Sequence, residues 1–260
     1  MASNAREMPL HFTGAAALVS GAASGIGRAT AHRLAATGMR VIMVDRDPEL
    51  DRVVDALVLE GRDVVALRLD IVDEDAVAAG LERVGADGLA YVVNCAGVHG
   101  QASFDDITMA EWRRVLDINL LGAFAVTRAA ATWMRESGGG AVVNITSVEA
   151  RRVVALVNPD ATPHYAASKA ALEMLTRSMA HALAPDSIRV NAVAPGFVST
   201  PMSRGNHATA GFPEQAASRT LVKRYAEPDE IAAAVSFLLS DEARFITASI
   251  LDVEGGFLSV

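Results

Sequence analysis

The chain has 260 residues, 51% of them apolar and 21% charged, which is long enough to bury a large core within one α/β domain. Its net charge of −8 argues against a nucleic-acid partner or an anionic membrane, because both attract excess Lys and Arg. Cys95 is the single cysteine, so no intrachain disulfide forms, and the apolar runs are too short and interrupted to predict a signal peptide or a membrane span. These properties predict a cytoplasmic protein that binds a small molecule.

Residues 1–14 mix charge, proline and small polar side chains without a period, and we expect them to form a flexible tail. Beyond them, short apolar and β-branched runs alternate with longer stretches of helical spacing. The expected strands are Ala15–Ser20, Arg40–Asp45, Val64–Asp70, Leu89–Asn94, Ala141–Thr146, Ile188–Val193 and Ser249–Val253. Strands that are apolar on both faces belong in a parallel sheet, so residues 15–260 are predicted to form one doubly wound α/β domain with helices on both faces.

Several helix boundaries have a local cause in the sequence. Asp73 is placed to cap a helix, and Thr108 with Glu111 has the spacing of a capping box. Pro228 suits the first turn of a later helix. The long irregular stretch over residues 197–227 is rich in Gly, Ser, His and Asn, and it predicts a lid or binding loop.

A glycine-rich turn follows the first expected strand and opens a helix. Missing side chains let a backbone approach a pyrophosphate, and a helix N-terminus supplies free N–H groups and partial positive charge. The alternative is a tight turn with no ligand, which the glycines alone do not exclude. The residues expected to contact a dinucleotide here are Gly21, Ser24, Gly25, Ile26 and Gly27.

Asp45 closes the second expected strand and favours NAD as the dinucleotide. A carboxylate at that position accepts hydrogen bonds from the hydroxyls of an adenosine ribose. It also repels the 2′-phosphate of NADP, although the neighbouring Arg46 would offset part of that repulsion. An Asp at a strand end can alternatively be simply solvated, so the assignment depends on its place after the glycine turn.

Tyr165 and Lys169 stand one helical turn apart on one face of an expected helix. A phenol with its ordinary pKa is a poor acid–base catalyst near neutrality, and a neighbouring ammonium lowers the pKa of a tyrosine by favouring the phenolate. Taken alone, such a pair is most often a surface contact.

The order of these motifs resembles the short-chain dehydrogenase/reductase family over essentially the whole chain beyond the tail. The residues that carry the resemblance are the glycine turn, Asn94-Cys95-Ala96-Gly97, Asn119, Ser147, Tyr165-x-x-x-Lys169 and Pro195-Gly196. The resemblance implies a seven-stranded parallel sheet in a single Rossmann-type domain. It also implies hydride transfer between a nicotinamide cofactor and a secondary alcohol or ketone, in a homotetramer or homodimer.

Carried over residue by residue, the resemblance makes Tyr165 the acid/base, with Lys169 lowering its pKa and holding the nicotinamide ribose. Ser147 would orient the substrate oxygen, and Asn119 would hold a water that links Lys169 to solvent. Asn119 continues an apolar helix face, where an amide must find partners, so a purely structural role at a helix bend is compatible with the relay. Further cofactor contacts implied are Asp70, Ile71, Asn94, Ala96, Gly97, Pro195, Val198 and Thr200.

The chain departs from the family pattern in three places. Ser20 and Cys95 replace a frequent Thr and a frequent Asn, and Cys95 is interpreted as buried packing rather than a reactive thiol. The segment from Val148 to His164 holds an insertion, with a surface turn expected at Asn158-Pro159-Asp160.

Glu149, two residues after Ser147, is placed to reach the substrate cavity, where its carboxylate would favour polar or hydroxylated substrates over hydrocarbon ketones. His99 and the lid over residues 197–227 would supply the remaining walls of the pocket. The alternative is that Glu149 pairs with Arg151 or Arg152 and braces the loop.

Other functions compete with oxidoreductase activity as explanations of these motifs. A catalytically silent protein that senses NAD would tolerate loss of the Asn119, Ser147, Tyr165 and Lys169 set, which is complete here. An NADPH-dependent 3-oxoacyl thioester reductase is disfavoured by Asp45, and enoyl reductases of the family space their Tyr and Lys more widely. The six histidines form no cluster in the sequence that predicts a metal site.

Overall fold

The computed structural model describes residues 10–100, 104–154, 162–203, 212 and 214–260. Its centre is a seven-stranded parallel sheet in the order β3-β2-β1-β4-β5-β6-β7, which confirms the predicted sheet. The strands are β1 (Ala16–Ser20), β2 (Arg40–Asp45), β3 (Val64–Arg68), β4 (Leu89–Asn94), β5 (Gly140–Ile145), β6 (Ile188–Pro195) and β7 (Ile250–Val253). They match the predicted runs closely, except that β3 ends two residues early and β6 continues two residues further.

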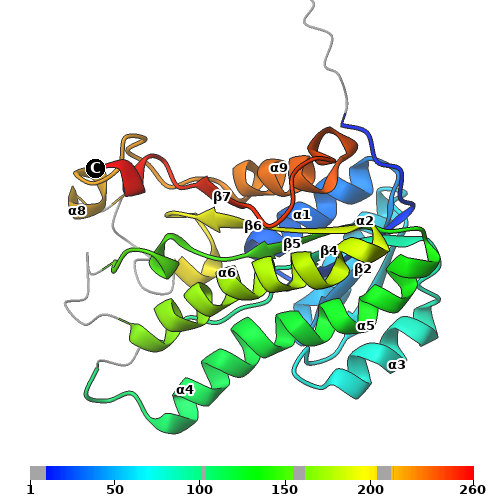
Figure 1. The fold of residues 1–260 in the computed structure, drawn as a ribbon, viewed down its shortest axis with the longest axis horizontal. Helices are drawn as coiled ribbons and strands as arrows, with labels where there is room; N and C mark the ends of the chain where they lie inside the picture. Colours follow the sequence, from blue (N-terminus) through cyan, green and yellow to red (C-terminus); the bar gives the residue numbers. More distant parts are fainter. Residues whose placement is uncertain (1–9, 101–103, 155–161, 204–211, 213) are drawn as a thin grey trace, which may run out of the picture.

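Helices cover both faces of the sheet (Figure 1). One face carries α1 (Gly25–Ala36), α2 (Glu49–Leu59) and α9 (Pro228–Leu239). The other carries α3 (Glu74–Val84), α5 (Ala123–Glu136) and α6 (Pro163–Leu183), with α4 (Met109–Leu116) leading into α5. The short elements are α8 (Glu214–Ala217), a π-helical turn η1 (Asp117–Gly122), and the 3₁₀ turns η2 (Val148–Ala150), η3 (Ala184–Asp186), η4 (Asp241–Ala243) and η5 (Phe257–Ser259).

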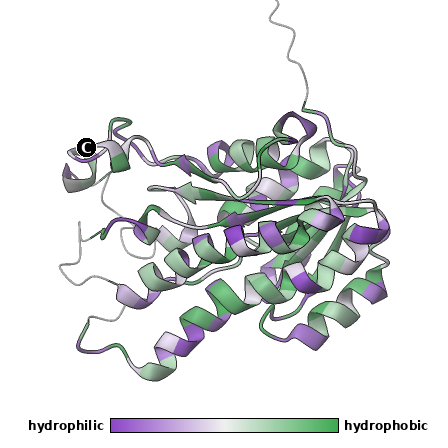
Figure 2. Ribbon diagram, in the orientation of Figure 1, coloured by the Kyte–Doolittle hydropathy of each residue, from purple (hydrophilic) through white to green (hydrophobic). Residues whose placement is uncertain are grey.

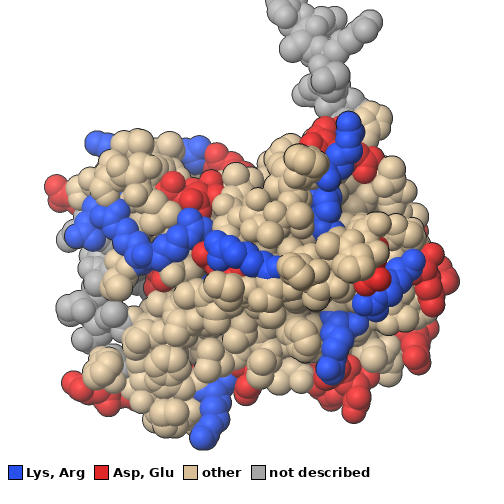
Figure 3. All heavy atoms as spheres, in the orientation of Figure 1, with Lys and Arg blue, Asp and Glu red and all other residues tan. Residues whose placement is uncertain are grey.

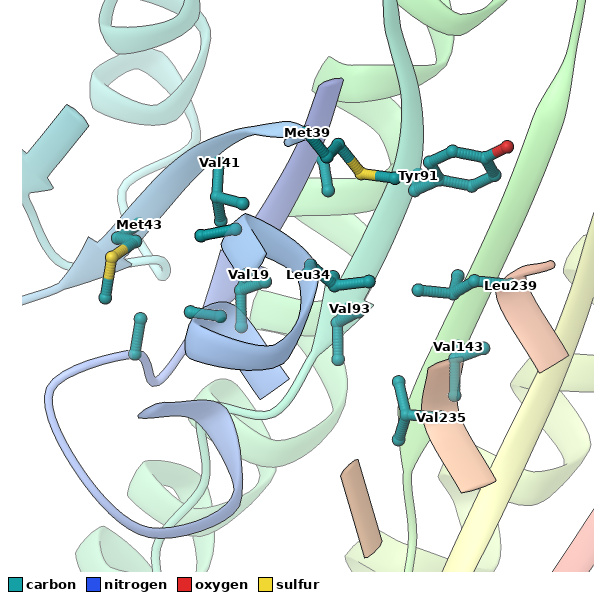
Figure 4. Packing of buried hydrophobic residues seen from close by; sticks show 14 of the residues in the cluster. Val19, Leu34, Met39, Val41, Met43, Tyr91, Val93, Val143, Val235 and Leu239 are labelled. Atoms are coloured by element: carbon teal, nitrogen blue, oxygen red, sulfur yellow. The ribbon is translucent and has the colours of Figure 1, made fainter. Parts of the chain in front are cut away.

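Two apolar layers hold the helices to the sheet, because side chains alternate along each strand. Val19 and Val41 face α1 and α9 in the layer drawn in Figure 4, whereas Leu18 and Ile42 face α3 and α5. Figure 2 shows the resulting pattern, with strands mostly hydrophobic and helices carrying hydrophilic residues on their outer sides. The all-apolar strands therefore explain why the sheet is parallel and covered twice.

One continuous helical run extends from Met109 to Glu136 and joins α4, η1 and α5, which the sequence patterns did not predict. By length and composition it is the one helix among the described residues that could cross a membrane. However, 56% of its apolar window is buried within the fold. Val126, Ala130 and Met134 from this run lie in the core beneath the sheet. Packing against the sheet accounts for its apolar character.

The predicted caps form at three helix starts. The Asp73 carboxylate accepts a hydrogen bond from Ala76 N at 3.0 Å, and Thr108 Oγ1 accepts one from Glu111 N at 3.1 Å. The second half of the expected box is absent, because the Glu111 carboxylate binds Arg114 instead, at 2.7 Å. Pro228 is the first residue of α9, as expected.

The predicted tail of residues 1–14 includes a segment with specific contacts. Residues 1–9 lie outside the described part of the chain. The His11 carbonyl accepts a hydrogen bond from Asp241 N at 2.9 Å, and Gly14 N donates to the Tyr91 hydroxyl at 2.9 Å. These contacts join residues 11–14 to η4 and β4, which the unpatterned sequence gave no reason to expect.

Candidate active site

A cavity of about 1120 Å³ opens at the carboxyl ends of the strands, where β1 lies between β2 and β4 and the order of the sheet reverses. Crevices at this place in an open α/β sheet are where ligands bind. The cavity extends from the glycine turn after β1 to Tyr165 at the start of α6, so the two predicted sites lie in one continuous space.

The glycine turn brings backbone rather than side chains to the cavity wall. Gly21 has φ +70°, and a Cβ there would lie 2.7 Å from Ala96 N, so only glycine fits between β1 and the end of β4. No side chain caps the N-terminus of α1, where Ser24, Gly25 and Ile26 line the cavity. The free amides of this turn suit a diphosphate.

Gly27 has a different role from the one predicted. It does not line the cavity, and a Cβ at this position would lie 2.1 Å from the Gly21 carbonyl oxygen. Gly27 therefore permits the close packing of helix and turn rather than contacting a ligand itself. The sequence pattern did not separate these roles, because both require glycine.

Asp45 lies at the cavity wall, and each of its carboxylate oxygens accepts one backbone hydrogen bond at 3.0 Å, from Ala23 N and Asp47 N. The carboxylate is thus held against the glycine turn with lone pairs left to accept ribose hydroxyls. Arg46 points instead toward Asp70, with Nη1 3.4 Å from Oδ2. An adenosine ribose fits this donor and acceptor set.

Ser20 joins the ends of β1 and β4. Its hydroxyl oxygen accepts hydrogen bonds from Cys95 N at 3.2 Å and Ala96 N at 3.3 Å. This holds Ala96 and Gly97 in the cavity wall, so the serine performs the linking task at this departure from the family pattern. Burial raises the pKa of Cys95 to about 12, which makes its thiol a poor nucleophile.

Asn94 was expected to contact the cofactor, but the structure places it in the core. It is 3% exposed and does not line the cavity. Its amide nitrogen donates to Thr127 Oγ1 at 2.9 Å and to Asn144 Oδ1 at 2.8 Å, and Asn144 in turn donates to Thr176 Oγ1 at 2.8 Å. This buried polar ladder ties β4 and β5 to α5 and α6.

Tyr165 and Lys169 lie on the cavity side of α6, with Lys169 Nζ 5.7 Å from the Tyr165 ring centroid. The ammonium donates to the Ile145 carbonyl at 2.8 Å, at the end of β5. Ser147 follows the same strand and lines the cavity beside Tyr165. The helix and the strand end therefore bring together three of the four predicted catalytic side chains.

The surroundings of Tyr165 shift its pKa in the direction opposite to the one predicted. Burial raises the pKa of Tyr165 above its usual range, the negative charge of Glu149 raises it further, and a hydrogen bond with Ser147 lowers it. Burial also lowers the pKa of Lys169 to about 8. Desolvation disfavours both charged forms and outweighs the attraction that the helical spacing suggested.

Asn119 is 1% exposed, lies within the π-helical turn η1 and does not line the cavity. Its oxygen accepts from Val98 N at 2.8 Å, and its nitrogen donates to the Val98 carbonyl and to Ser168 Oγ, each at 3.0 Å. These bonds tie the helix bend to the loop after β4. The water relay stays a prediction.

Gly97 lies close to both Asn119 and Lys169. A Cβ on Gly97 would lie 3.3 Å from Asn119 Oδ1 and 3.5 Å from Lys169 Nζ, which is tighter than an ordinary contact with the amide oxygen. The absence of a side chain here lets an acceptor and a donor approach the same stretch of backbone.

Glu149 lines the cavity next to Tyr165, as the sequence predicted. One carboxylate oxygen lies 3.7 Å from His99 Nε2, and the other accepts a hydrogen bond from Thr162 Oγ1 at 3.2 Å. The His99 ring in turn packs on Tyr165, with ring centroids 4.5 Å apart. His99, Glu149 and Thr162 form one polar wall of the substrate end.

The alternative role for Glu149, pairing with Arg151 or Arg152, is wrong for the described contacts. Arg151 binds Glu173 at 2.9 Å and Asp252 at 2.8 Å, and Arg152 Nη1 donates to the Phe257 carbonyl at 2.7 Å. Both arginines therefore brace the loop after β5 from its outer side and leave Glu149 facing the cavity.

Some lining residues were missed by sequence reasoning. Thr162 and the Ile145 carbonyl bind predicted residues, but nothing in the local sequence distinguishes them. From the expected lid, Val198 and Thr200 line the cavity as predicted with Pro195, and Phe197, Met202 and Tyr225 add apolar surface. The expected turn at 158–160 and residues 204–211 of the lid lie outside the described residues.

Comparison with known proteins relates this site to oxidoreductases. A family model described as enoyl-(acyl carrier protein) reductase matches residues 21–258. Cis-4-hydroxycyclohexanecarboxylate dehydrogenase of Sinomonas cyclohexanicum is 39% identical over 96% of this chain and 98% of its own length. Galactitol 2-dehydrogenase (L-tagatose-forming) of Cereibacter sphaeroides is 38% identical over 94% of this chain and 95% of its own.

Solved structures show the same similarity with cofactors bound. A gluconate 5-dehydrogenase from Burkholderia cenocepacia in complex with NADP and tartrate has a TM-score of 0.88 at 29% identity, covering 96% of this chain and 97% of its own. A 3-oxoacyl-[acyl-carrier protein] reductase with bound NAD from Brucella melitensis has a TM-score of 0.83 at 33% identity, covering 95% and 92%. Similar chains thus hold either nicotinamide dinucleotide.

Proposed function

This chain belongs to the short-chain dehydrogenase/reductase family and is an oxidoreductase of the kind that acts on hydroxyl groups, and we propose that it uses NAD to interconvert a secondary alcohol and a ketone. The observation that carries the proposal is the single cavity that joins the Asp45 carboxylate to the Tyr165 phenol. A protein that only sensed NAD would have no use for a buried Tyr, Lys and Ser set at the far end of the same space.

The choice of NAD over NADP is supported by charge at the adenosine end. Asp45 faces the cavity with its carboxylate held by two backbone amides. Arg46, the cation that a 2′-phosphate would need, is directed to Asp70. The 2′-phosphate of NADP would be repelled here by the carboxylates of Asp45 and Asp70, and Arg46 is already paired with Asp70. The ribose hydroxyls of NAD would instead donate hydrogen bonds to Asp45.

At the other end, Tyr165 exchanges a proton with the substrate oxygen and Ser147 orients that oxygen. NAD, when bound, would supply the hydride acceptor. Lys169, when protonated, adds a positive charge that favours the phenolate against the burial that raises the pKa of Tyr165. The protein contributes positioning and proton transfer.

Lys169 is also the proposed entry to a proton relay. Its ammonium is anchored on the Ile145 carbonyl, and both the ammonium and Asn119 Oδ1 lie close to Gly97. A water between them would accept a hydrogen bond from Lys169 and donate one to the Asn119 oxygen. The fixed amide of Asn119 supports this role because its orientation is set by Val98 and Ser168.

The alternative function is an NADPH-dependent reductase of 3-oxoacyl thioesters. Asp45 disfavours its cofactor. Among the described residues, the Lys and Arg side chains that line the cavity are Lys169 and Arg46, so the Tyr165 end offers no basic patch to a phosphopantetheine carrier. A substrate that is a small neutral molecule, in a cytoplasmic enzyme, fits the site and the composition better.

We propose that the chain forms a homo-oligomer, as a tetramer or a dimer. Figure 3 shows a broad area without charged side chains over α5 and α6. Exposed apolar side chains of η1, α5 and α6 include Leu121, Phe124 and Met174, which are 53%, 40% and 61% exposed. An apolar surface of this kind favours self-association. Light scattering should give a mass above 27.2 kDa, and L121D should lower it.

The experiment that tests the proposed activity is a screen of secondary alcohols with NAD or NADP, read as reduced cofactor at its absorbance band. We expect turnover with NAD and a lower kcat/KM with NADP. Reduction of 3-oxoacyl thioesters with NADPH, without alcohol oxidation by NAD, would establish the alternative instead.

A further inference from the structure

The polar wall formed by His99, Glu149 and Thr162 is not used by the reaction proposed above. Glu149 is 16% exposed at its side chain and carries a carboxylate close enough to Tyr165 to raise the pKa of its phenol. Partly buried carboxylates usually pair with a cation or serve a ligand. His99 is the nearest basic group, and the neighbouring Arg151 and Arg152 are engaged elsewhere.

The carboxylate is held where a substrate would pass it. Glu149 N donates to Ser147 Oγ at 3.1 Å, so the residue that orients the reacting oxygen also anchors the backbone of Glu149. Thr162 Oγ1 holds one carboxylate oxygen, and His99 connects the other to the face of Tyr165. The free lone pairs of the carboxylate therefore lie beside the reacting centre and at a fixed place.

The charge balance of this end selects against acidic substrates. Lys169 is the only Lys or Arg side chain lining the Tyr165 end among the described residues, and its ammonium is bound to the Ile145 carbonyl. A substrate carboxylate would meet Glu149 with no arginine to neutralise it. Val154, Phe197 and Tyr225 also line the cavity and offer apolar surface to a hydrocarbon face of the substrate.

We propose that Glu149 is a specificity-determining residue that accepts a hydrogen bond from a second hydroxyl of the substrate, next to the carbinol that is oxidised. The preferred substrates are neutral vicinal diols or polyols with one hydrocarbon face, and hydroxy acids are excluded by charge. This inference rests on the proposed alcohol oxidation and names the substrate class of the same site.

The proposed role of Glu149 is tested with three cyclohexane substrates that differ only in the group next to the carbinol. They are cyclohexanol, cis-1,2-cyclohexanediol and cis-2-hydroxycyclohexanecarboxylate. Because hydrogen bonds to a charged group are strong, we expect the diol to exceed cyclohexanol in kcat/KM by about tenfold to a hundredfold, with the hydroxy acid poorest. E149Q should lose most of the diol preference, measured as the ratio of kcat/KM for the diol to kcat/KM for cyclohexanol, and should accept the hydroxy acid better.

The matched control is E173Q, which removes a carboxylate that braces the same loop through Arg151 without reaching the cavity. It should lower stability and keep the diol preference. A preference that survives E149Q, that is lost equally in E173Q, or that is absent from the wild type overturns the inference while cyclohexanol turnover still upholds the proposed activity. Oxidation of none of the screened alcohols, with NADH still bound, would instead refute that activity.

A second measurement does not depend on turnover. The diol should raise the melting temperature of the wild-type NADH complex and have little effect on that of E149Q, because only a ligand that binds the folded state stabilises it. Equal stabilisation of the two complexes would overturn the inference whatever the rates show.

Discussion

The two ends of the cavity are lined by different kinds of group. At the end proposed for adenosine, the lining groups are the backbone of the glycine turn and the strand-end Asp45 carboxylate, which accepts hydrogen bonds from Ala23 N and Asp47 N. At the Tyr165 end, the lining groups are side chains from three separate places in the chain, namely His99, the pair Ser147 and Glu149, and Tyr165. The first end depends on main-chain geometry, and the second on side-chain packing.

This difference explains why one end suits a cofactor shared by many enzymes and the other a particular substrate. Backbone amides cannot be substituted without changing the fold, so the diphosphate site is insensitive to most side-chain changes. The side chains at Tyr165 can change one at a time, and their supports lie outside the cavity, as with Arg151 and Arg152. Mutations at the two ends should therefore separate cofactor binding from turnover.

The largest effect is expected for Y165F, which removes only the titrating hydroxyl. Turnover should fall by about 10²–10⁴-fold while the Kd for NADH is unchanged, as measured by initial rates and by fluorescence titration. Y225F, another cavity tyrosine, is the control and should retain most activity. A loss of less than about tenfold in Y165F would rule out acid–base catalysis by this residue.

The adenosine end is tested by D45S. Loss of a charged acceptor should lower kcat/KM for NAD by about tenfold or more, and loss of the negative charge should raise kcat/KM for NADP. D51S removes a carboxylate of α2 that pairs with Arg68 at 3.3 Å and does not line the cavity, and it should leave the cofactor ratio unchanged. An unchanged ratio in D45S would remove Asp45 from the cofactor site.

The bracing of the substrate end is tested by R151M. This change leaves Glu173, whose side chain is 8% exposed, without its cation and should lower the free energy of unfolding by about 2 kcal/mol in urea titrations. Adding E173Q to R151M should recover part of the loss. If the single and double variants are equally unstable, the ion pair is not what holds this loop.

The smallest effect concerns Lys169. Burial lowers the pKa of Lys169 to about 8 in the fold, whereas the unfolded chain keeps the ordinary value of 10.5. Between these values the unfolded chain binds a proton that the folded chain lacks, so stability should rise with pH, by about 1 kcal/mol from pH 8 to 9. Above pH 9 the buried Cys95, whose pKa burial raises to about 12, acts in the opposite direction.

K169M should flatten this rise in urea unfolding followed at the two pH values. The same slope in wild type and variant would contradict the assignment of the titration to Lys169.

Much of the fold and of the adenosine end was predictable from sequence, because strands, glycines and the Asp45 carboxylate act through local spacing. The exceptions share a physical reason. Gly27 and Asn94 serve packing and a buried polar ladder rather than the ligand, and only three-dimensional neighbours distinguish these uses. The π-helical turn that orients Asn119 leaves no periodic signal in so few residues.

At the Tyr165 end, spacing predicted which residues meet but not their energetics. The i and i+4 positions of Tyr165 and Lys169 gave the shared helix face correctly. Burial, which depends on the whole fold, then reversed the expected shift in the pKa of Tyr165. The partner of Glu149 was likewise undetermined, since Thr162 and His99 are distant from it in sequence.

Hydride transfer between NAD and a carbinol carbon in this cavity can be followed by isotope labelling. The best alcohol from the screen, deuterated at the carbinol carbon, would be incubated with NAD and the wild-type enzyme, and the reduced cofactor analysed by mass spectrometry. We expect deuterium in the reduced nicotinamide with wild type and almost none with Y165F. Reduced cofactor without deuterium, or equal labelling by Y165F, would contradict it.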